Sequence, residues 1–394
     1  MSTPGAARLA AGTRPWQTEA AVGIAGLDAL ASEWRELWAG AGGGEPFVHP
    51  QWIRAQVAAL EDPRRLLLVT ARRDGRLGAA LALIRERGGL YGLPVRRWRA
   101  AAGVYSVRFD LCALPGDEGR QAASAIGHYL GQRGDWDVIE LRDVPAGGAA
   151  EALVAAAQEE GSSAGVWASL RSPYLGLEAG AAWEQALKAS FRQRLRRTRR
   201  RLEETGSAGG TGVQLRQASW SSAAGLQAEL EEFYRLESSG WKGRQRSAIA
   251  ARPRTRAFYD QACTAMAAEG CLVLHRLEFD GDLMAMACGL RHSGWYYVLK
   301  WSYNEAYAKF GAGQMLTESI LRECAETGLQ GFDFTGPDDE YKRRWTDQGR
   351  PHAWLYMFRR GVYGDLLRWA KFGCAPRLRS WLRPAAKPPD GESS

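Results

Sequence analysis

The stretch "DGDLMAMACGLR" at residues 280–291 decides the fold, because an earlier stretch, "DGRLGAALALIR" at residues 74–85, repeats its pattern. Both read Asp-Gly-x-Leu-x-Ala, continue with apolar residues and end in Arg. An apolar, extended segment precedes each Asp-Gly pair, and such a pair between two apolar runs is typical of a tight β-hairpin turn. We therefore expect a strand, a turn and a second strand at both places.

The chain beyond each hairpin continues the similarity. After a further turn, at Gly88-Gly89 in the first half and at Ser293-Gly294 in the second, a third strand is expected, most clearly in "WYYVLKWSYN". A helical segment then leads to one more extended stretch, "WDVIELRDVP" in the first half and "GFDFTGPD" in the second. One plan used twice predicts two α/β domains of roughly 150 to 200 residues each. The alternative is a chance coincidence of two hairpins, since Asp-Gly hairpins are common.

The composition limits the classes of protein to consider. Of the 394 residues 45% are apolar, yet no run approaches the ~20 apolar residues that a membrane-spanning helix needs. The N-terminus lacks the regions of a signal peptide and the six cysteines form no C-x-x-C pair, so we expect a cytoplasmic protein without a disulfide scaffold or zinc ribbon. The net charge of +8 favours an anionic partner such as nucleic acid, a phosphorylated cofactor, a nucleotide sugar or acidic lipid.

A glycine turn in the second half has the form of a phosphate cradle. Gly311 and Gly313 stand between the third strand and a segment whose apolar residues recur at helical spacing. Free backbone N–H groups at a helix start, together with the helix dipole, attract a pyrophosphate, and glycine lets the phosphate approach closely. The same pattern also occurs as a plain turn. It is neither a P-loop nor a Rossmann fingerprint, since no Lys-Ser/Thr pair and no third glycine follow.

Residues 190–206, "SFRQRLRRTRRRLEETG", are either a nucleic-acid grip or an anion clamp. The apolar stripe that predicts a packed amphipathic helix here comprises Phe191, Leu195, Thr198 and Leu202. The arginines that gather on another side are Arg192, Arg196, Arg199 and Arg200. Such a face can hold a pyrophosphate, a nucleotide sugar, a lipid-linked sugar or a tRNA backbone. The alternative is a solvated face whose arginines pair with Glu203 and Glu204.

Together these features resemble the GNAT acyltransferase superfamily, and their doubling resembles the tandem GNAT-like proteins related to FemAB and to CelD-type polysaccharide-biosynthesis acetyltransferases. The segments that carry the resemblance are "PFVHPQW" at 46–52, "RQRLRRTRRRLEETG" at 192–206, "LESSGWKGRQRSAI" at 236–249, "KFGAGQML" at 309–316 and "FDFTGPDDEYKRRWTD" at 332–347. The resemblance implies two tandem GNAT-like α/β domains, each a mixed, mostly antiparallel sheet flanked by helices, at residues 20–175 and 176–375. We expect a disordered tail at residues 376–394.

The resemblance also implies a reaction. An acyl group, expected to be acetyl, passes from acyl-CoA to an amine or hydroxyl of a sugar, polysaccharide or cell-envelope precursor, without a metal. The expected donor-binding residues of the second domain are Lys309, Gly311, Ala312, Gly313 and Gln314. The family usually has Gln or Arg at the first place of this loop, where this chain has Ala308. Two alternatives stay open: a FemAB-like aminoacyl-tRNA-dependent transferase, and a catalytically silent module that binds nucleic acid or an envelope complex.

In GNAT enzymes the acceptor attacks the thioester directly, so the protein aligns the reactants and moves protons. The residues predicted for proton transfer are Asp333 as base, Tyr341 as proton donor to the leaving thiolate, and Glu237 as the next candidate base. The residues predicted to bind substrate are Arg192, Arg196, Arg199, Trp241, Lys242, Lys300 and Lys342. As structural alternatives, Asp333 only satisfies backbone donors at a strand end, and Lys300 reaches solvent from a sheet edge.

The C-terminal segment from residue 362 onward interleaves apolar and basic residues. Its apolar members are Leu366, Leu367, Trp369, Leu378, Trp381 and Leu382. A basic helix with Trp suits a surface of acidic lipid, which predicts a cytoplasmic protein peripheral to the inner membrane. The alternative is a helix packed on its own domain.

Overall fold

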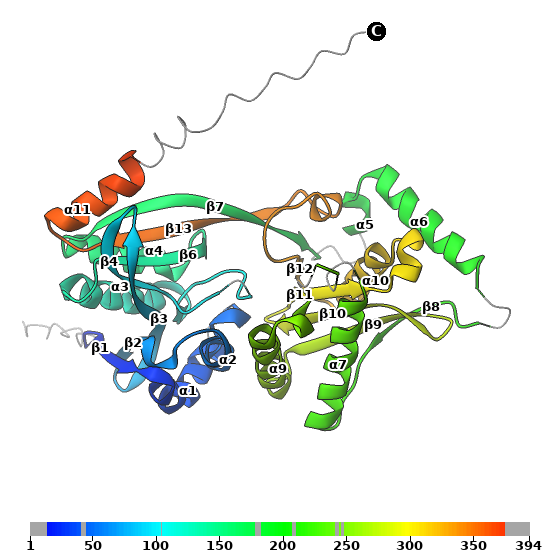
Figure 1. Cartoon of the computed structure of the whole chain (residues 1–394), viewed down its shortest axis with the longest axis horizontal. Helices are drawn as coiled ribbons and strands as arrows, with labels where there is room; N and C mark the ends of the chain where they lie inside the picture. Colours follow the sequence, from blue (N-terminus) through cyan, green and yellow to red (C-terminus); the bar gives the residue numbers. More distant parts are fainter. Residues whose placement is uncertain are drawn as a thin grey trace, which may run out of the picture.

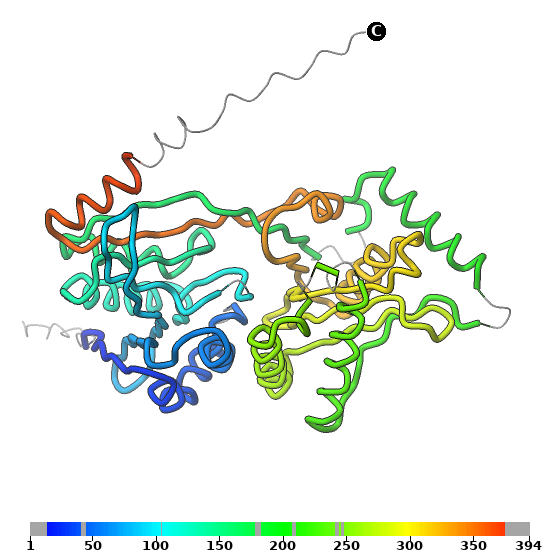
Figure 2. The backbone as a smooth tube through the Cα atoms, viewed as in Figure 1, coloured from blue at the N-terminus to red at the C-terminus, as the bar shows by residue number. Residues whose placement is uncertain are grey.

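The computed structural model describes residues 14–40, 45–103, 105–177, 183–206, 210–240, 244–245 and 248–374. Figure 1 shows two lobes side by side, each with helices around a part of one long sheet. The tube in Figure 2 follows the chain through the N-terminal lobe, into the C-terminal lobe and back. The expected tail at residues 376–394 lies outside the described residues.

The elements of the N-terminal lobe follow the order expected from the sequence. They are β1 (Gln17–Val22), α1 (Gly23–Gly40), α2 (Pro50–Leu60), β2 (Leu66–Arg73), β3 (Arg76–Leu90), β4 (Leu93–Ala100), β5 (Cys112–Ala113), α3 (Gly116–Gln132), β6 (Val138–Pro145), α4 (Ala149–Glu159) and β7 (Ser163–Gly176).

The C-terminal lobe repeats most of this order. Its elements are α5 (Trp183–Ala186), α6 (Ala189–Glu203), β8 (Val213–Gln217), α7 (Ala223–Ser239), α9 (Pro253–Ala268), β9 (Leu272–Phe279), β10 (Asp282–His292), β11 (Trp295–Tyr303), the 3-10 turn η5 (Glu305–Phe310), α10 (Ala312–Glu326) and β12 (Gly331–Asp333). The chain ends with β13 (Gly349–Phe358) and α11 (Val362–Trp369). In the two copies β1 to β4 correspond to β8 to β11, α3 to α10, and β6 to β12.

The strands form one mixed sheet, in the order β1-β2-β3-β4-β6-β13-β7-β12-β11-β10-β9-β8, with β5 beside β3. Two long strands connect the lobes (Figure 1). The first part of β7 pairs with β13 and its last three residues pair with β12 of the C-terminal lobe. Strand β13 returns from the C-terminal lobe to lie between β6 and β7. The domain bounds expected from the sequence stay a prediction, to which the topology adds this returning strand.

Both predicted Asp-Gly hairpins are confirmed. Asp74 and Gly75 have φ angles of 52° and 79°, and Asp280 and Gly281 have φ angles of 49° and 90°. Two successive residues with positive φ form the tight turn that matches the twist of antiparallel strands. The hairpins β2–β3 and β9–β10 therefore arise from the same local signal.

One of the two following turns was predicted wrongly. Gly88 and Gly89 lie within β3 and pair with β4, so they do not turn the chain. Because that ladder continues to Leu90, the two-residue turn falls on Tyr91 and Gly92, with φ angles of 51° and 84°. In the second copy the turn lies at Ser293-Gly294, as predicted.

The lobes share a continuous core beneath α1, α2, α7 and α9. Trp52 of α2 packs edge-on against Phe258 of α9, with ring centroids 5.2 Å apart, and Tyr105 stacks on the same ring. On the opposite side of the sheet, α3 and α4 cover the N-terminal part, while α6 and α10 cover the C-terminal part. The relative position of the two copies is therefore fixed by apolar packing as well as by the shared strands.

Helix α11 lies at the outer end of the N-terminal lobe (Figure 1). Val362, Leu366 and Trp369 on it are exposed, whereas Leu367 is buried. The expected membrane contact of this basic segment stays a prediction. Within the described ranges, no helix is long and apolar enough to cross a bilayer.

Candidate functional site

The site begins where two parallel strands of the C-terminal copy separate. Strands β11 and β12 pair over three positions only, the last being Tyr297 opposite Asp333. Past this point the Thr335 hydroxyl donates to the Val298 carbonyl over 2.5 Å, and the Phe334 amide turns to Pro173 of β7 instead. In the described part of the chain, no strand pairs with this edge of β11 beyond Tyr297.

Strand β11 carries a bulge just past the separation. Cys288 and Gly289 of β10 face Lys300 and Val298, so Leu299 is an extra residue in the ladder. A bulge bends a strand, increases its twist and is common beside functional sites. It follows that the backbone of β11 changes direction at the place where its edge is free.

The glycine turn follows β11 and starts α10. Gly311 precedes the helix with a φ of 59°, a left-handed conformation that glycine adopts without strain. Ala312 and Gly313 form the first turn of α10, where backbone N–H groups lack partners within the helix. A Cβ on Gly313 would lie 3.0 Å from the Trp301 ring, so this glycine is also required by close packing.

Tyr341 lies against the same helix start. Its hydroxyl is 3.1 Å from the Gly313 carbonyl and 2.5 Å from the Thr317 hydroxyl, and its ring lies 5.3 Å from that of Trp301. Burial raises the pKa of Tyr341 to about 12, although the hydrogen bond from Thr317 lowers it in part. The structure thus brings Tyr341 and the glycine turn together, and the phenol remains protonated at neutral pH.

The predicted ligand-binding side chains around the turn occupy different environments. Lys309 is exposed, with its ammonium 5.0 Å above the Phe310 ring. Gln314 is half-buried, and its backbone N–H donates to the Gly311 carbonyl. Lys300 is half-buried in β11 beside the bulge. Lys300 therefore lies beside the bulge of β11, and Lys309 lies in η5, just before the glycine turn.

The arginine-rich helix is α6, and the predicted amphipathic packing is confirmed. Its apolar residues Phe191, Leu195 and Leu202 are buried in the core under α10. The side chain of Arg199 lies 3.3 Å from Glu318, a buried residue of α10. Arg192 donates to the Glu184 carbonyl and Arg196 is exposed. Helix α6 therefore lies next to α10, and Arg199 pairs with a carboxylate of that helix.

Asp333 lies in a buried ion cluster between the lobes. It is 0% exposed and pairs with Arg108, which comes from the loop after β4, and with Arg350, at 3.2 Å. Its other oxygen accepts from the Thr335 amide over 2.8 Å. Arg108 also contacts Glu45 over 3.2 Å, and burial raises the pKa of that carboxyl group. Burial alone would lower the pKa of Arg108, but the charges of Asp333 and Glu45 raise it above its ordinary value.

The remaining predicted residues are held by their own neighbours. Glu237 is 1% exposed and accepts from the Ile249 amide over 2.7 Å, which fixes α7 to the following turn. The Lys342 ammonium donates to the carbonyls of Thr335 and Pro337, both over 2.8 Å, and so braces the loop after β12. Trp241 and Lys242 lie outside the described residues.

The N-terminal copy has the same strand pair in a closed form. Strands β4 and β6 also pair over three positions, ending with Arg99 opposite Glu140. The segment after β4 then returns to β6, where the Phe109 amide donates to the Asp143 carbonyl over 3.2 Å. Asp110 accepts from the first two amides of α4, and burial raises the pKa of Asp110 to about 6. The chain's own carboxylate thus occupies the start of α4, the helix that follows this strand pair, and not that of α3, the counterpart of α10.

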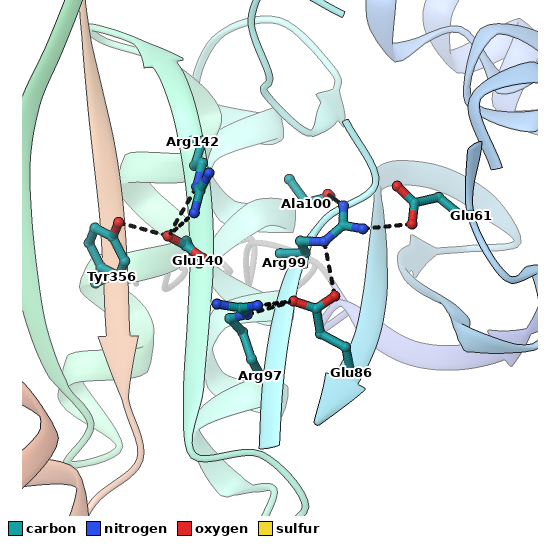
Figure 3. Close-up of polar contacts among 8 residues, drawn as sticks. All are labelled: Glu61, Glu86, Arg97, Arg99, Ala100, Glu140, Arg142 and Tyr356. Carbon is teal, nitrogen blue, oxygen red and sulfur yellow. Dashed lines mark hydrogen bonds and ion pairs between the residues drawn. The ribbon is translucent and has the colours of Figure 1, made fainter. Parts of the chain in front are cut away.

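A cavity of about 610 Å³ lies between the lobes. We call it the interlobe cavity. Its wall includes β4, β6, Gly336 and Pro337 beyond β12, and the loop residues Ala102, Gly103, Ser106, Val107 and Arg108. Figure 3 shows polar side chains that line or adjoin it: Glu61, Glu86, Arg97, Arg99, Glu140, Arg142 and Tyr356. The cavity therefore reaches from the closed strand pair of the first copy to the loop beside the open pair of the second.

Sequence reasoning missed both the interlobe cavity and the arginine at the buried ion cluster. Arg108 and Asp333 are separated by 225 positions, so no local pattern relates them. The repeat offered one signal: when the two copies are aligned, Glu140 holds the position in the first copy that Asp333 holds in the second. Among the described residues, no group of His, Cys, Asp and Glu side chains is arranged to hold a metal ion.

The sequence profile of the acetyltransferase (GNAT) domain matches residues 5–113 and 189–343, more than half of the chain. No curated protein matches the sequence. FemX has a similar structure, with a TM-score of 0.54 and 9% identity over 87% of this chain and 98% of that one.

The C-terminal domain of a putative lysylphosphatidylglycerol synthetase from Agrobacterium fabrum gives a TM-score of 0.52 and 12% identity over 88% and 95%. A tandem GNAT protein from the clavulanic acid biosynthesis pathway gives 0.43 and 15% over 86% and 98%. At these identities the first two likenesses show a shared fold.

Proposed function

The chain belongs to the acetyltransferase (GNAT) domain family, and from this premise we propose that it transfers an acetyl group, or another acyl group, from acyl-CoA to an amine or hydroxyl of a sugar, polysaccharide or cell-envelope precursor. The observation that carries the proposal is the free edge of β11 beside the start of α10. The edge offers backbone groups to an extended donor arm, and the helix start offers N–H groups to a pyrophosphate. In the first copy, by contrast, the chain after β4 bonds back to β6.

The residues at this site support a direct transfer. The acceptor nitrogen or oxygen attacks the thioester carbon and gives up its proton to solvent, a bond to that carbon forms, and the carbon–sulfur bond breaks. The leaving thiolate takes a proton, for which Tyr341 is the proposed donor, since its raised pKa keeps the phenol protonated until then. Lys309 is the proposed partner of the donor phosphates, because it is exposed next to the glycine turn.

The position of Asp333 favours a structural role over that of a general base. Two guanidinium groups and a backbone amide use its oxygens, and the carboxylate is not exposed. A base has to reach the proton that it removes, directly or through water. We therefore propose that Asp333 holds Arg108 and Arg350, and through them the N-terminal lobe, in place beside the open strand pair.

Titration with acetyl-CoA by calorimetry tests the proposal. We expect one donor molecule per chain, because the first copy is closed by its own residues. Absence of binding by acetyl-CoA and by longer acyl-CoA would overturn the donor assignment. In that case aminoacyl transfer that is lost on RNase treatment would support the tRNA-dependent alternative.

A further inference from the structure

Glu140 lines the interlobe cavity with a carboxylate of which only one oxygen accepts hydrogen bonds from the described residues of the protein. The residue is 4% exposed. Its Oε1 accepts from Arg142 over 3.0 and 2.9 Å and from the Tyr356 hydroxyl over 2.7 Å (Figure 3). Within the part of the chain that the structure describes, Oε2 has no hydrogen-bonding partner. Because Glu140 lines the cavity and its Oε2 accepts no hydrogen bond from these residues, this atom is open to a donor inside the cavity.

Asp143, three residues after Glu140 in β6, also has one carboxylate oxygen without a partner in the described part of the chain. Its Oδ1 accepts from the Trp354 indole over 2.8 Å and from the Ser169 hydroxyl, while Oδ2 has no partner among the described residues. Two lining arginines are complementary to these carboxylates. Arg97 and Arg142 bind their carboxylate partners through Nε and Nη2, which leaves Nη1 of each to donate. The wall therefore carries both spare acceptors and spare donors.

The charges around the cavity are already balanced. Four arginines and three acidic residues line it. Each guanidinium has a carboxylate partner: Arg97 has Glu86, Arg99 has Glu86 and Glu61, Arg108 has Glu45 and Asp333, and Arg142 has Glu140. Among the described lining residues, every cation therefore already has a carboxylate partner, and the spare carboxylate oxygens repel a phosphate.

We propose that the interlobe cavity binds a neutral, polyhydroxylated ligand, a saccharide, with Glu140 as its buried anchor. A hydroxyl group both donates and accepts, so a saccharide can satisfy the spare oxygens of Glu140 and Asp143 and the spare Nη1 groups of Arg97 and Arg142 together. A volume of about 610 Å³ is within the range of small-molecule sites and leaves room for more than one sugar ring. That this saccharide is the acyl acceptor rests on the proposed function.

Binding of sugar probes to the full chain, followed by calorimetry and ligand-observed NMR, tests this site. The neutral probes are cellobiose and N-acetylglucosamine; glucose 6-phosphate and L-lysine are the charged ones. We expect a neutral probe to bind at least tenfold more tightly than either charged probe. We also expect Glu140→Gln to weaken that binding by about tenfold, the effect of a lost hydrogen bond to a charged group.

Two further variants separate the site from effects on folding. Asp137→Asn removes another nearly buried, arginine-paired carboxylate, just before β6 but outside the cavity wall, and should leave sugar binding unchanged. Leu170→Trp narrows the cavity without touching an ion pair and should weaken sugar binding as Glu140→Gln does.

Three results would overturn the inference: no binding by either neutral probe, tighter binding by a charged probe, or wild-type sugar binding in both cavity variants. Acetyl-CoA titration of the same samples keeps the two proposals apart. If the wild type binds a sugar but no acetyl-CoA, the result counts against the proposed function. If it binds acetyl-CoA but no sugar, the result counts against the saccharide site.

Discussion

In the N-terminal copy the chain that follows β4 bonds back to β6 and its Asp110 covers a helix start, whereas in the C-terminal copy β12 ends at Asp333 and leaves the edge of β11 free. Both copies begin with the same three-position parallel pair. The hairpin ladder of the first copy runs without interruption from β3 to β4, while that of the second contains the bulge at Leu299. The difference teaches that a repeated fold can divide its work: the second copy leaves a strand edge free beside a helix start, whereas in the first copy the chain bonds back across the pair, beside the interlobe cavity.

The carboxylates in the third position of each strand pair sharpen this contrast. Asp333 and Glu140 occupy equivalent places, and both are buried. Asp333 pairs with Arg108, whose side chain is 1% exposed, but Glu140 pairs with Arg142, whose side chain is 53% exposed. Hence Asp333 lies in the ion cluster between the lobes, whereas Glu140 faces the interlobe cavity.

The largest expected effect is therefore on stability. Asp333→Asn leaves the buried Arg108 with only one full carboxylate partner, and breaking such a pair costs about 3 kcal/mol in the free energy of unfolding. The matched change Glu140→Gln should cost about 1 kcal/mol, because Arg142 can turn to solvent and Gln still accepts from Tyr356. Urea unfolding of both variants measures the difference. Wild-type stability with a large loss of kcat in Asp333→Asn would instead identify Asp333 as the base.

The second prediction concerns proton delivery in the open copy. Tyr341→Phe should lower kcat by roughly a hundredfold, the usual size of a lost acid catalyst, while the Kd for acetyl-CoA stays the same. Tyr307→Phe is the control, because among the described residues the Tyr307 hydroxyl bonds to the exposed Asp282 alone, over 3.2 Å. Equal turnover in the two variants would remove Tyr341 from the mechanism.

The third prediction compares two glycines at equivalent helix starts. Gly311 precedes α10 and Gly116 begins α3, with φ angles of 59° and 70°, so valine strains both positions alike. Gly311→Val should raise the Kd for acetyl-CoA by at least about tenfold, since the side chain blocks the approach of the phosphates. Gly116→Val should leave donor binding unchanged. A similar loss in both variants would mean that the effect comes from backbone strain and not from the donor site.

The sequence predicted the elements whose signals are local. The Asp-Gly turns, the start of α10 and the buried stripe of α6 each follow from residues within a few positions of one another. The return of β13 and the pairing of Arg108 with Asp333 depend on residues far apart in the chain, which no periodicity records. For the same reason Asp333 was assigned a catalytic role: a carboxylate at a strand end has the same local pattern whether it faces a substrate or a buried arginine.

The smallest expected effect lies on α6, where the comparison is between two arginines of one helix. Arg199 lies 3.3 Å from the buried Glu318, so part of its charge is used within the protein, whereas Arg196 is exposed. If α6 adds positive potential to the neighbouring donor site, Arg196→Gln should weaken acetyl-CoA binding by about twofold to threefold at low salt, and 0.5 M salt should abolish the difference by screening. Arg360→Gln, which changes an exposed arginine next to α11 in the other lobe, is the control and should have no effect at either salt concentration. A difference between Arg196→Gln and the wild type that persists in 0.5 M salt would point to direct contact with the donor. If the two proteins do not differ at low salt, the arginines of α6 form a solvated face that has no part in donor binding.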